Sequence, residues 1–224
     1  GTEAYGREDW TGAEEAWGKI LDMGQEAPEL YFNLGNACYR EDDLAHAILN
    51  YERALRLDPS YADARFNLEF VRSSLQDKME SVPEFFLSVW VKNLSRLLSS
   101  DVWAWAGIIF FALTLALVLL FLLGRSPAVR RTGFSAGIVS LLLCILSISM
   151  AAGQRADYFR EDGAIVVSAV SPVKSSPSSD SSKDLFVLHE GTKVIVLDSV
   201  GQWKNISLPD GRQGWILETD MEII

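Results

Sequence analysis

The side chains in this sequence that could do acid–base or metal chemistry are few and scattered. The two histidines, His46 and His189, are far apart, and neither has a cysteine or a second histidine at a spacing typical of a metal site. The segment His189–Gly191 (HEG) lacks the second histidine of a zinc-protease motif. We therefore expect both histidines to be ordinary surface residues, with His46 on the outward side of a helix.

Patterns for covalent catalysis or phosphate binding are equally lacking in the sequence. It contains no glycine-rich phosphate loop and no Cys–His pair. Cys38 and Cys144 lie in segments of opposite character, so we expect no disulfide between them. The acidic segment Glu41–Asp43 is explained by a solvated turn between helices. We predict a protein without enzyme activity, cofactor or metal.

Charge is distributed unevenly along the 224 residues, which carry 30 acidic and 20 basic side chains and a formal net charge of −10. Residues 1–82 hold 17 acidic and 8 basic side chains, whereas residues 103–123 and 133–152 hold none. No basic cluster is present that could neutralise the phosphates of a nucleic acid. We therefore predict no nucleic-acid partner and no small-molecule substrate.

Helical spacing dominates the first region, residues 1–82. From Pro28 to Tyr61, small and apolar residues recur with a helical period, and the acidic turn separates two helices. The segment resembles the tetratricopeptide repeat, a helix-turn-helix unit of about 34 residues. The matching residues are Tyr31, Leu34, Gly35, Ala47, Tyr51, Ala54 and Pro59. This resemblance implies an all-α array in which Gly35 and Ala47 allow the paired helices to approach closely.

The same frame extends in both directions from this repeat. Upstream it places Ala13 and Trp17 in the second helix of a repeat whose first helix is missing or truncated at Gly1. Downstream it places Asn67 in a capping helix, where Glu69 stands in place of the close-packing glycine. About two repeats and a cap are fewer than a free-standing array has, so we expect further sequence or a partner to complete it.

The first helix of each repeat lines the concave groove in tetratricopeptide arrays, so the resemblance implies a protein-binding surface. Its residues are Glu29, Phe32, Asn36, Tyr39 and Arg40 from one helix and Asp63, Phe66 and Phe70 from the next. Asn36 and Asn67 match two positions that clamp a peptide carboxylate in some members, but Phe32 replaces the lysine of that clamp. We favour an apolar groove for a partner helix or extended segment. The alternative is that the aromatic side chains pack within the stack.

Two uncharged stretches follow the repeats, at 103–123 and 133–152. Each is long enough for a helix to cross the roughly 30 Å hydrocarbon core of a bilayer. We predict a two-helix transmembrane hairpin over residues 101–153, with a buried hairpin in a soluble protein as the alternative.

The loop at 124–132 decides the expected orientation of this hairpin. It carries Arg125, Arg130 and Arg131 and no acidic residue, so the positive-inside rule predicts a cytoplasmic loop. Both flanking regions then lie in the periplasm, and the chain is a bacterial inner-membrane protein. Export of the first region requires a signal sequence, which fits a chain that begins at Gly1 after cleavage.

Two further patterns accompany the hairpin. Residues 83–100 form an amphipathic segment, with Phe86 and Trp90 on one helical side and Lys92 and Arg96 on another, typical of a helix in the membrane interface. Small residues recur every three or four positions in the second stretch, as expected of a helix-packing seam. These residues are Gly133, Gly137, Ser140, Cys144 and Ser147. The seam packs either on the first stretch or on a helix of another subunit.

Five short strands separated by turns are predicted in residues 163–224, where Asp210–Gly211 indicates a two-residue hairpin. This region resembles the bacterial SH3-like domain, a small all-β barrel. The matching residues are Gly191, Val194, Trp203, Gly211, Gly214 and Trp215. The resemblance implies a long polar first loop at 175–183 and a place for Trp203 and Trp215 in the core or, alternatively, on a binding platform.

The order of these parts resembles the BatE family, encoded in the Bat-type aerotolerance operon. The implied fold class is a multidomain membrane protein with all-α repeats, a two-helix hairpin and an all-β barrel. The implied function is a non-catalytic scaffold in an envelope complex linked to oxidative-stress tolerance. Its implied partners are membrane-anchored von Willebrand A-domain proteins and a MoxR-type ATPase system. The alternatives are an envelope sensor that binds peptidoglycan through the SH3-like domain, and a chaperone-docking receptor with cytoplasmic repeats.

Overall fold

The structure is a computed structural model that describes residues 1–75, 77, 86–159, 162–178 and 182–224. The chain forms two compact units. The first combines Gly1–Phe85 with Arg160–Ile224, and the second is Phe86–Phe159. The helical repeats and the C-terminal β domain, Gly163–Ile224, pack together in the first unit.

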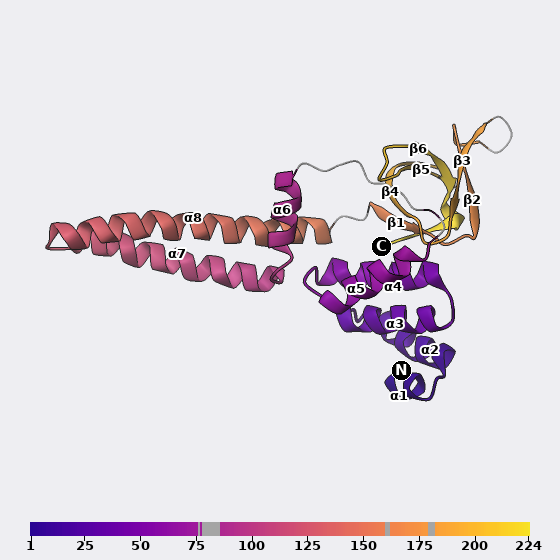
Figure 1. Cartoon of the computed structure of the whole chain (residues 1–224), viewed down its shortest axis with the longest axis horizontal. Helices are drawn as coiled ribbons and strands as arrows, with labels where there is room; N and C mark the ends of the chain where they lie inside the picture. The colour runs from indigo at the N-terminus through magenta and orange to yellow at the C-terminus, as the bar shows by residue number, and fades with distance from the viewer. Residues whose placement is uncertain (76, 78–85, 160–161, 179–181) are drawn as a thin grey trace. The chain divides into compact units, whose positions relative to one another are not determined.

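Five helices form the N-terminal part of the first unit, and α2 to α5 stack on one another (Figure 1). They are α1 (Thr2–Gly6), α2 (Trp10–Asp22), α3 (Pro28–Arg40), α4 (Leu44–Leu57) and α5 (Ala62–Ser73). The turn before α2 is repeated before α4. Asp9 and Asp43 cap the two helices, each accepting a hydrogen bond of 3.0 Å from a backbone N–H three residues on. The expected repeat frame is visible in this geometry, in which α1 precedes α2 as α3 precedes α4.

Close packing within the repeat depends on Gly35. A Cβ atom at this position would lie 2.7 Å from the ring of Tyr51 and 3.1 Å from the carbonyl oxygen of Ala47. Tyr51 is 1% exposed, and its hydroxyl donates a hydrogen bond of 2.8 Å to Asn36. The glycine is therefore required by the ring that lies against it, since a side chain there would separate α3 from α4.

A seven-stranded antiparallel sheet forms the β domain, with strand order β3-β2-β6-β5-β4-β1-β7. The strands are β1 (Gly163–Val166), β2 (Val170–Lys174), β3 (Asp184–His189), β4 (Lys193–Val200), β5 (Trp203–Ser207), β6 (Gln213–Leu217) and β7 (Met221–Ile223). The sheet is strongly curved (Figure 1). Its strands contribute a cluster of buried, mostly aliphatic side chains. The expectation of five strands was wrong by two, since β2 contains Pro172 and β7 has three residues, and both features weaken a strand signal.

The β5–β6 hairpin also differs from the expected two-residue turn. The N–H of Gly211 donates to the carbonyl of Leu208 at 3.0 Å, and the N–H of Leu208 donates to the carbonyl of Arg212 at 2.9 Å. Gly211 has a φ of 90°. The hairpin loop therefore has three residues. It consists of a turn that contains Pro209, followed by a glycine in the left-handed conformation.

The repeats and the β domain share one hydrophobic cluster. Ile48 of α4 and Val71 of α5 lie in this cluster with Ile165 of β1 and Ile224, and all four are buried. Gly191, in the turn between β3 and β4, approaches Ile48 so closely that a Cβ atom would lie 3.0 Å from its terminal methyl group. The β domain thus packs on α4 and α5 through this cluster.

The second unit consists of α6 (Phe86–Ser95) and the antiparallel pair α7 (Ser100–Leu123) and α8 (Pro127–Tyr158). Two helices, α7 and α8, are long and apolar enough to cross a membrane. Much of the expected loop at 124–132 is helical instead, because α8 begins at Pro127 with Ser126 as its N-cap. The expected interfacial helix is shorter than 83–100, of which residues 83–85 lie outside the described part.

All five residues of the predicted seam face α7. Gly133 lies where a Cβ atom would be 2.9 Å from the backbone nitrogen of Phe121. Ser140 donates to the carbonyl of Phe110 at 2.9 Å, and Cys144 donates to the carbonyl of Gly107 at 3.4 Å. Gly137 and Ser147 are buried on the same side. Of the two alternatives for the seam, the structure shows contact with the first stretch of the same chain.

Candidate protein-binding site

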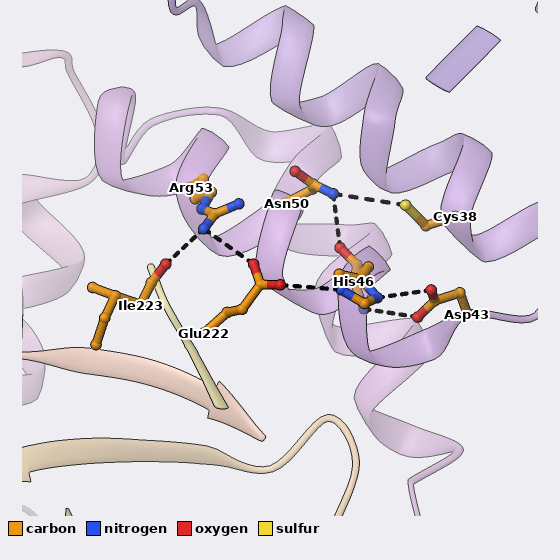
Figure 2. A network of polar contacts seen from close by, with 7 residues as sticks. All are labelled: Cys38, Asp43, His46, Asn50, Arg53, Glu222 and Ile223. Carbon is orange, nitrogen blue, oxygen red and sulfur yellow. Dashed lines mark hydrogen bonds and ion pairs between the residues drawn. The ribbon is translucent and has the colours of Figure 1, made fainter. Parts of the chain in front are cut away.

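The β domain covers one side of the repeats through polar contacts between α4 and β7 (Figure 2). Arg53 donates to the carbonyl of Ile223 at 2.7 Å and lies 3.5 Å from Glu222. His46 lies 2.7 Å from Asp43 through Nδ1 and 3.4 Å from Glu222 through Nε2. The hydrogen bond to Asp43, with the charge of Glu222, raises the pKa of His46 to about 9 despite partial burial. His46 is therefore half-buried at an internal contact.

A buried carboxylate lies at the same contact. Glu52 of α4 forms ion pairs with Lys193 of β4, at 2.8 Å, and with Arg72 of α5. Burial opposes the ionisation of Glu52, but the two cations and their hydrogen bonds hold its pKa below the usual range. Loss of Lys193 would leave Glu52 with only one of its two cations, so this ion pair favours one specific placement of the β domain.

A second carboxylate, Asp77, binds the turn between β3 and β4. It accepts hydrogen bonds from the backbone N–H of His189 at 2.8 Å and from the hydroxyl of Thr192 at 3.1 Å, and lies 2.9 Å from His189 Nδ1. These hydrogen bonds outweigh partial burial and lower the pKa of Asp77. The expectation that both histidines are ordinary surface residues is therefore wrong, since each joins the repeats to the β domain.

The repeats also carry exposed aromatic side chains on α3 and α5. Phe66 and Phe70 of α5 are 70% and 53% exposed, and Tyr39 of α3 is 38% exposed. The rings of Tyr39 and Phe70 meet edge to face, with centroids 6.0 Å apart. We call these three residues the aromatic strip. Exposed aromatic side chains on neighbouring helices are typical of a protein-binding surface.

Two predicted groove residues lie inside the stack instead. Phe32 packs on Tyr51 and Tyr61, with ring centroids 6.0 and 5.1 Å away. Asn36 accepts hydrogen bonds of 2.8 Å from the hydroxyl of Tyr51 and from the side-chain amide of Asn67. The two positions that match a carboxylate clamp are therefore bonded to each other. The alternative of packing within the stack holds for Phe32, and the structure offers no free clamp here.

The remaining predicted groove residues lie at the two ends of these helices. Glu29 and Asp63 are exposed in the first turns of α3 and α5, where a carboxylate interacts favourably with the helix dipole. Arg40 lies at the end of α3, and its guanidinium carbon is 4.8 Å from the centre of the Trp10 ring. The predicted set is thus divided, with Tyr39 and Arg40 at the same end as Phe70.

An open depression of about 450 Å³ adjoins the strip at this end. It is lined by Glu8, Trp10, Tyr39, Arg40 and Asp42. Glu8 and Asp42 occupy equivalent turns of successive repeats and have φ values of 63° and 64°. The sequence analysis missed Glu8, Trp10 and Asp42 as site residues. The repeat frame could have indicated the two acidic residues, because it assigns Glu8 and Asp42 to equivalent turns of successive repeats.

The tryptophans of the β domain lie outside its buried cluster. Trp203 and Trp215 are each partly exposed, whereas Ile206 and Ile216, which alternate with them along β5 and β6, are fully buried. Alternation along a strand places the tryptophans on the outer face of the sheet. The expectation of core residues is therefore wrong, and the alternative of an outer platform fits their positions.

Within the described part of the chain, no three His, Cys, Asp or Glu side chains are grouped so that they could hold a metal ion. Both cysteines are free and buried. Burial raises the pKa of the Cys38 thiol, so this cysteine is a poor nucleophile.

Comparison with known proteins bears on the repeats. Neither the curated proteins nor the solved structures gave a match to this chain. Residues 1–62, which include α1 to α4, match the tetratricopeptide repeat family. The match and the repeated turn geometry together support a tetratricopeptide-like arrangement of α1 to α4.

Proposed function

We propose that this chain is a non-catalytic adaptor, anchored in a membrane by α7 and α8, that binds a partner protein through the aromatic strip. The observation that carries the proposal is the exposure of Tyr39, Phe66 and Phe70 on repeats that pack against the β domain through other residues. Tetratricopeptide repeats are a protein-binding architecture, and their extended concave surface is the part that takes the ligand.

Membrane anchoring is supported by the outer surfaces of α7 and α8. Apolar side chains such as Ile109, Phe111 and Leu142 are more than half exposed, and the polar side chains Thr114 and Ser140 face each other at 3.0 Å between the helices. In water this arrangement exposes a large apolar surface, whereas in a bilayer it satisfies each polar group internally. Gln154 also donates to the carbonyls of Ser95 and Leu98, which ties α6 to the end of the hairpin.

The packing of the first unit supports the proposed topology. A hairpin of two spans returns the chain to the side from which it entered, and the repeats and the β domain must share one side in order to pack together. Arg125, Arg130 and Arg131 lie at the turn of the hairpin, so the positive-inside rule favours a cytoplasmic turn and a periplasmic first unit.

The more specific role is that of a scaffold in a Bat-type envelope complex, with von Willebrand A-domain proteins and a MoxR-type ATPase system as partners. It rests on the resemblance of the whole order of parts to the BatE family and of the β domain to bacterial SH3-like domains. An envelope sensor that binds peptidoglycan is the second candidate, favoured by the outer-face positions of Trp203 and Trp215.

Affinity purification of the full chain from its own membranes tests the adaptor role. We expect stoichiometric partner proteins that are lost with Phe66→Ala/Phe70→Ala and retained with Met23→Ala, a control residue 74% exposed outside the strip. Retention of every partner by the double variant would contradict binding through the strip. Recovery of bound muropeptides without partner proteins would favour the envelope sensor.

Labelling with an impermeant maleimide tests the topology. Single cysteines replace Glu15 and Ser199, both exposed in the first unit, and Arg125 at the turn of the hairpin. The native Cys38 and Cys144 are buried and add little background. We expect intact cells to label the first two positions and to protect Arg125→Cys until lysis. The reverse pattern would indicate cytoplasmic repeats and favour a chaperone-docking receptor.

A further inference from the structure

The aromatic strip and the open depression form one continuous surface, because Tyr39 belongs to both. Its ring meets Phe70 on one side, and the side chain lines the depression with Trp10 and Arg40. An apolar partner segment that covers Phe70 therefore lies beside the depression. The next side chain of that partner segment can then enter the depression.

The charges in the depression favour a positively charged occupant. Two of its three charged residues are carboxylates, Glu8 and Asp42. Arg40 stacks on the Trp10 ring at 4.8 Å, so the chain itself already places a guanidinium on this aromatic face. The neighbouring Glu41, which accepts a hydrogen bond of 2.5 Å from Thr11, adds a further negative charge.

Two basic side chains of α5, Arg65 and Arg72, are bound within the first unit. Arg65 of α5 donates to the carbonyl of Pro59, and Arg72 pairs with the buried Glu52. Asp63 and Glu69 flank Phe66 and Phe70 on the exposed side of α5. The surface around the strip is therefore acidic, in agreement with the excess of acidic over basic side chains in residues 1–82.

We propose that this surface binds a segment of a partner protein in which a lysine or arginine lies next to apolar side chains. The apolar side chains cover Tyr39 and Phe70, and the cation enters the depression, where the carboxylates of Glu8 and Asp42 receive it. A cation close to two carboxylates gains electrostatic energy from both. An acidic segment would be repelled, and a purely apolar one would bury the carboxylates without partners.

This inference rests on the proposed function, and its test begins with an unbiased probe. A displayed library of random peptides is selected on the full chain in nanodiscs of uncharged lipid, with counter-selection on Phe66→Ala/Phe70→Ala. We expect enriched peptides to combine lysine or arginine with apolar residues. Enriched peptides that are acidic or uncharged would overturn the inference and leave the proposed function standing. Absence of any peptide that distinguishes the two proteins would overturn both.

Titration of the most enriched peptide then tests the role of the carboxylates. Glu8→Gln/Asp42→Asn should weaken binding about fivefold, as expected for two partly solvated charge contacts, whereas the exposed control Glu15→Gln should leave it unchanged. Salt at about 1 M, where the Debye length is about 3 Å, should remove most of the difference between wild type and the double variant. Equal affinities of the two proteins at low salt would refute a cation in the depression.

Circular dichroism separates loss of binding from loss of folding. Both substitutions keep the shape of the side chain, and asparagine tolerates the positive φ of position 42. Thermal unfolding of the double variant should therefore match that of Glu15→Gln. We expect the double variant to melt normally while its peptide binding no longer responds to salt. A merely structural role of the two carboxylates would not give this combination.

Discussion

Replacement of Gly35 by alanine tests the contact that brings α3 and α4 together. The added Cβ atom would lie 2.7 and 2.8 Å from two ring carbons of Tyr51, well inside van der Waals contact. The ring is fully buried and held at its hydroxyl by Asn36, and the backbone carbonyl of Ala47 closes the other side. Overpacking of this kind costs about 1–3 kcal/mol, while alanine regains about 1 kcal/mol of helix propensity over glycine.

Gly18 provides the matched control, because it lies inside α2 with no atom within 4 Å of its would-be Cβ. Gly18→Ala should gain the helix propensity alone. The difference between the two variants isolates the packing cost, since the propensity contribution cancels, and we expect Gly35→Ala to be less stable by about 1–3 kcal/mol. Urea unfolding of the full chain in mild detergent, followed by circular dichroism, measures this difference. Equal stability of the two variants would refute the reasoning.

Three further outcomes follow from other contacts. The carboxylates beside His46 raise its pKa to about 9, so protonated His46 stabilises the folded state. This contribution to the free energy of unfolding is full below about pH 6.5 and is lost as the pH rises through about 9. His46→Gln should abolish this pH dependence in unfolding experiments. Glu52→Gln should cost about 1–3 kcal/mol, because it leaves two cations partly buried without a counter-charge, and urea unfolding should detect the loss. Gly133→Leu should force α7 from α8 and speed the alkylation of Cys144, whereas Gly153→Leu, in open space on the same helix, should not.

Local patterns in the sequence were sufficient for much of the fold. The repeat frame, read from positions such as Gly35 and Ala47, placed the helices and the turn between them, because each repeat packs mainly on its neighbours in sequence. The small residues of α8 indicated its packing face for a similar reason, since residues three or four apart share one side of a helix. The β domain was placed correctly, although the weak strands β2 and β7 were missed.

Long-range packing was not predictable in the same way. Ile48, Ile165 and Ile224 form the contact between repeats and β domain, but each looks in sequence like any core residue of its own element. The polar pairs His46–Glu222 and Asp77–His189 join residues more than a hundred positions apart, and no spacing rule connects them. The candidate site was only partly predicted for the same reason, because the hydrogen bonds of Asn36 depend on the neighbouring helix.

The shared hydrophobic cluster of α4 and β1 has a consequence for the biosynthesis of this protein. The repeats emerge first from the ribosome, yet the strands that cover Ile48 and Val71 are made only after α6, α7 and α8 have been completed. During that interval the nascent repeats expose an apolar face, and Glu52 has Arg72 but not yet Lys193 as an ion-pair partner. Maturation of the first unit is therefore coupled to completion of the whole polypeptide, and a chain truncated before β1 should be a preferred substrate for quality-control proteases.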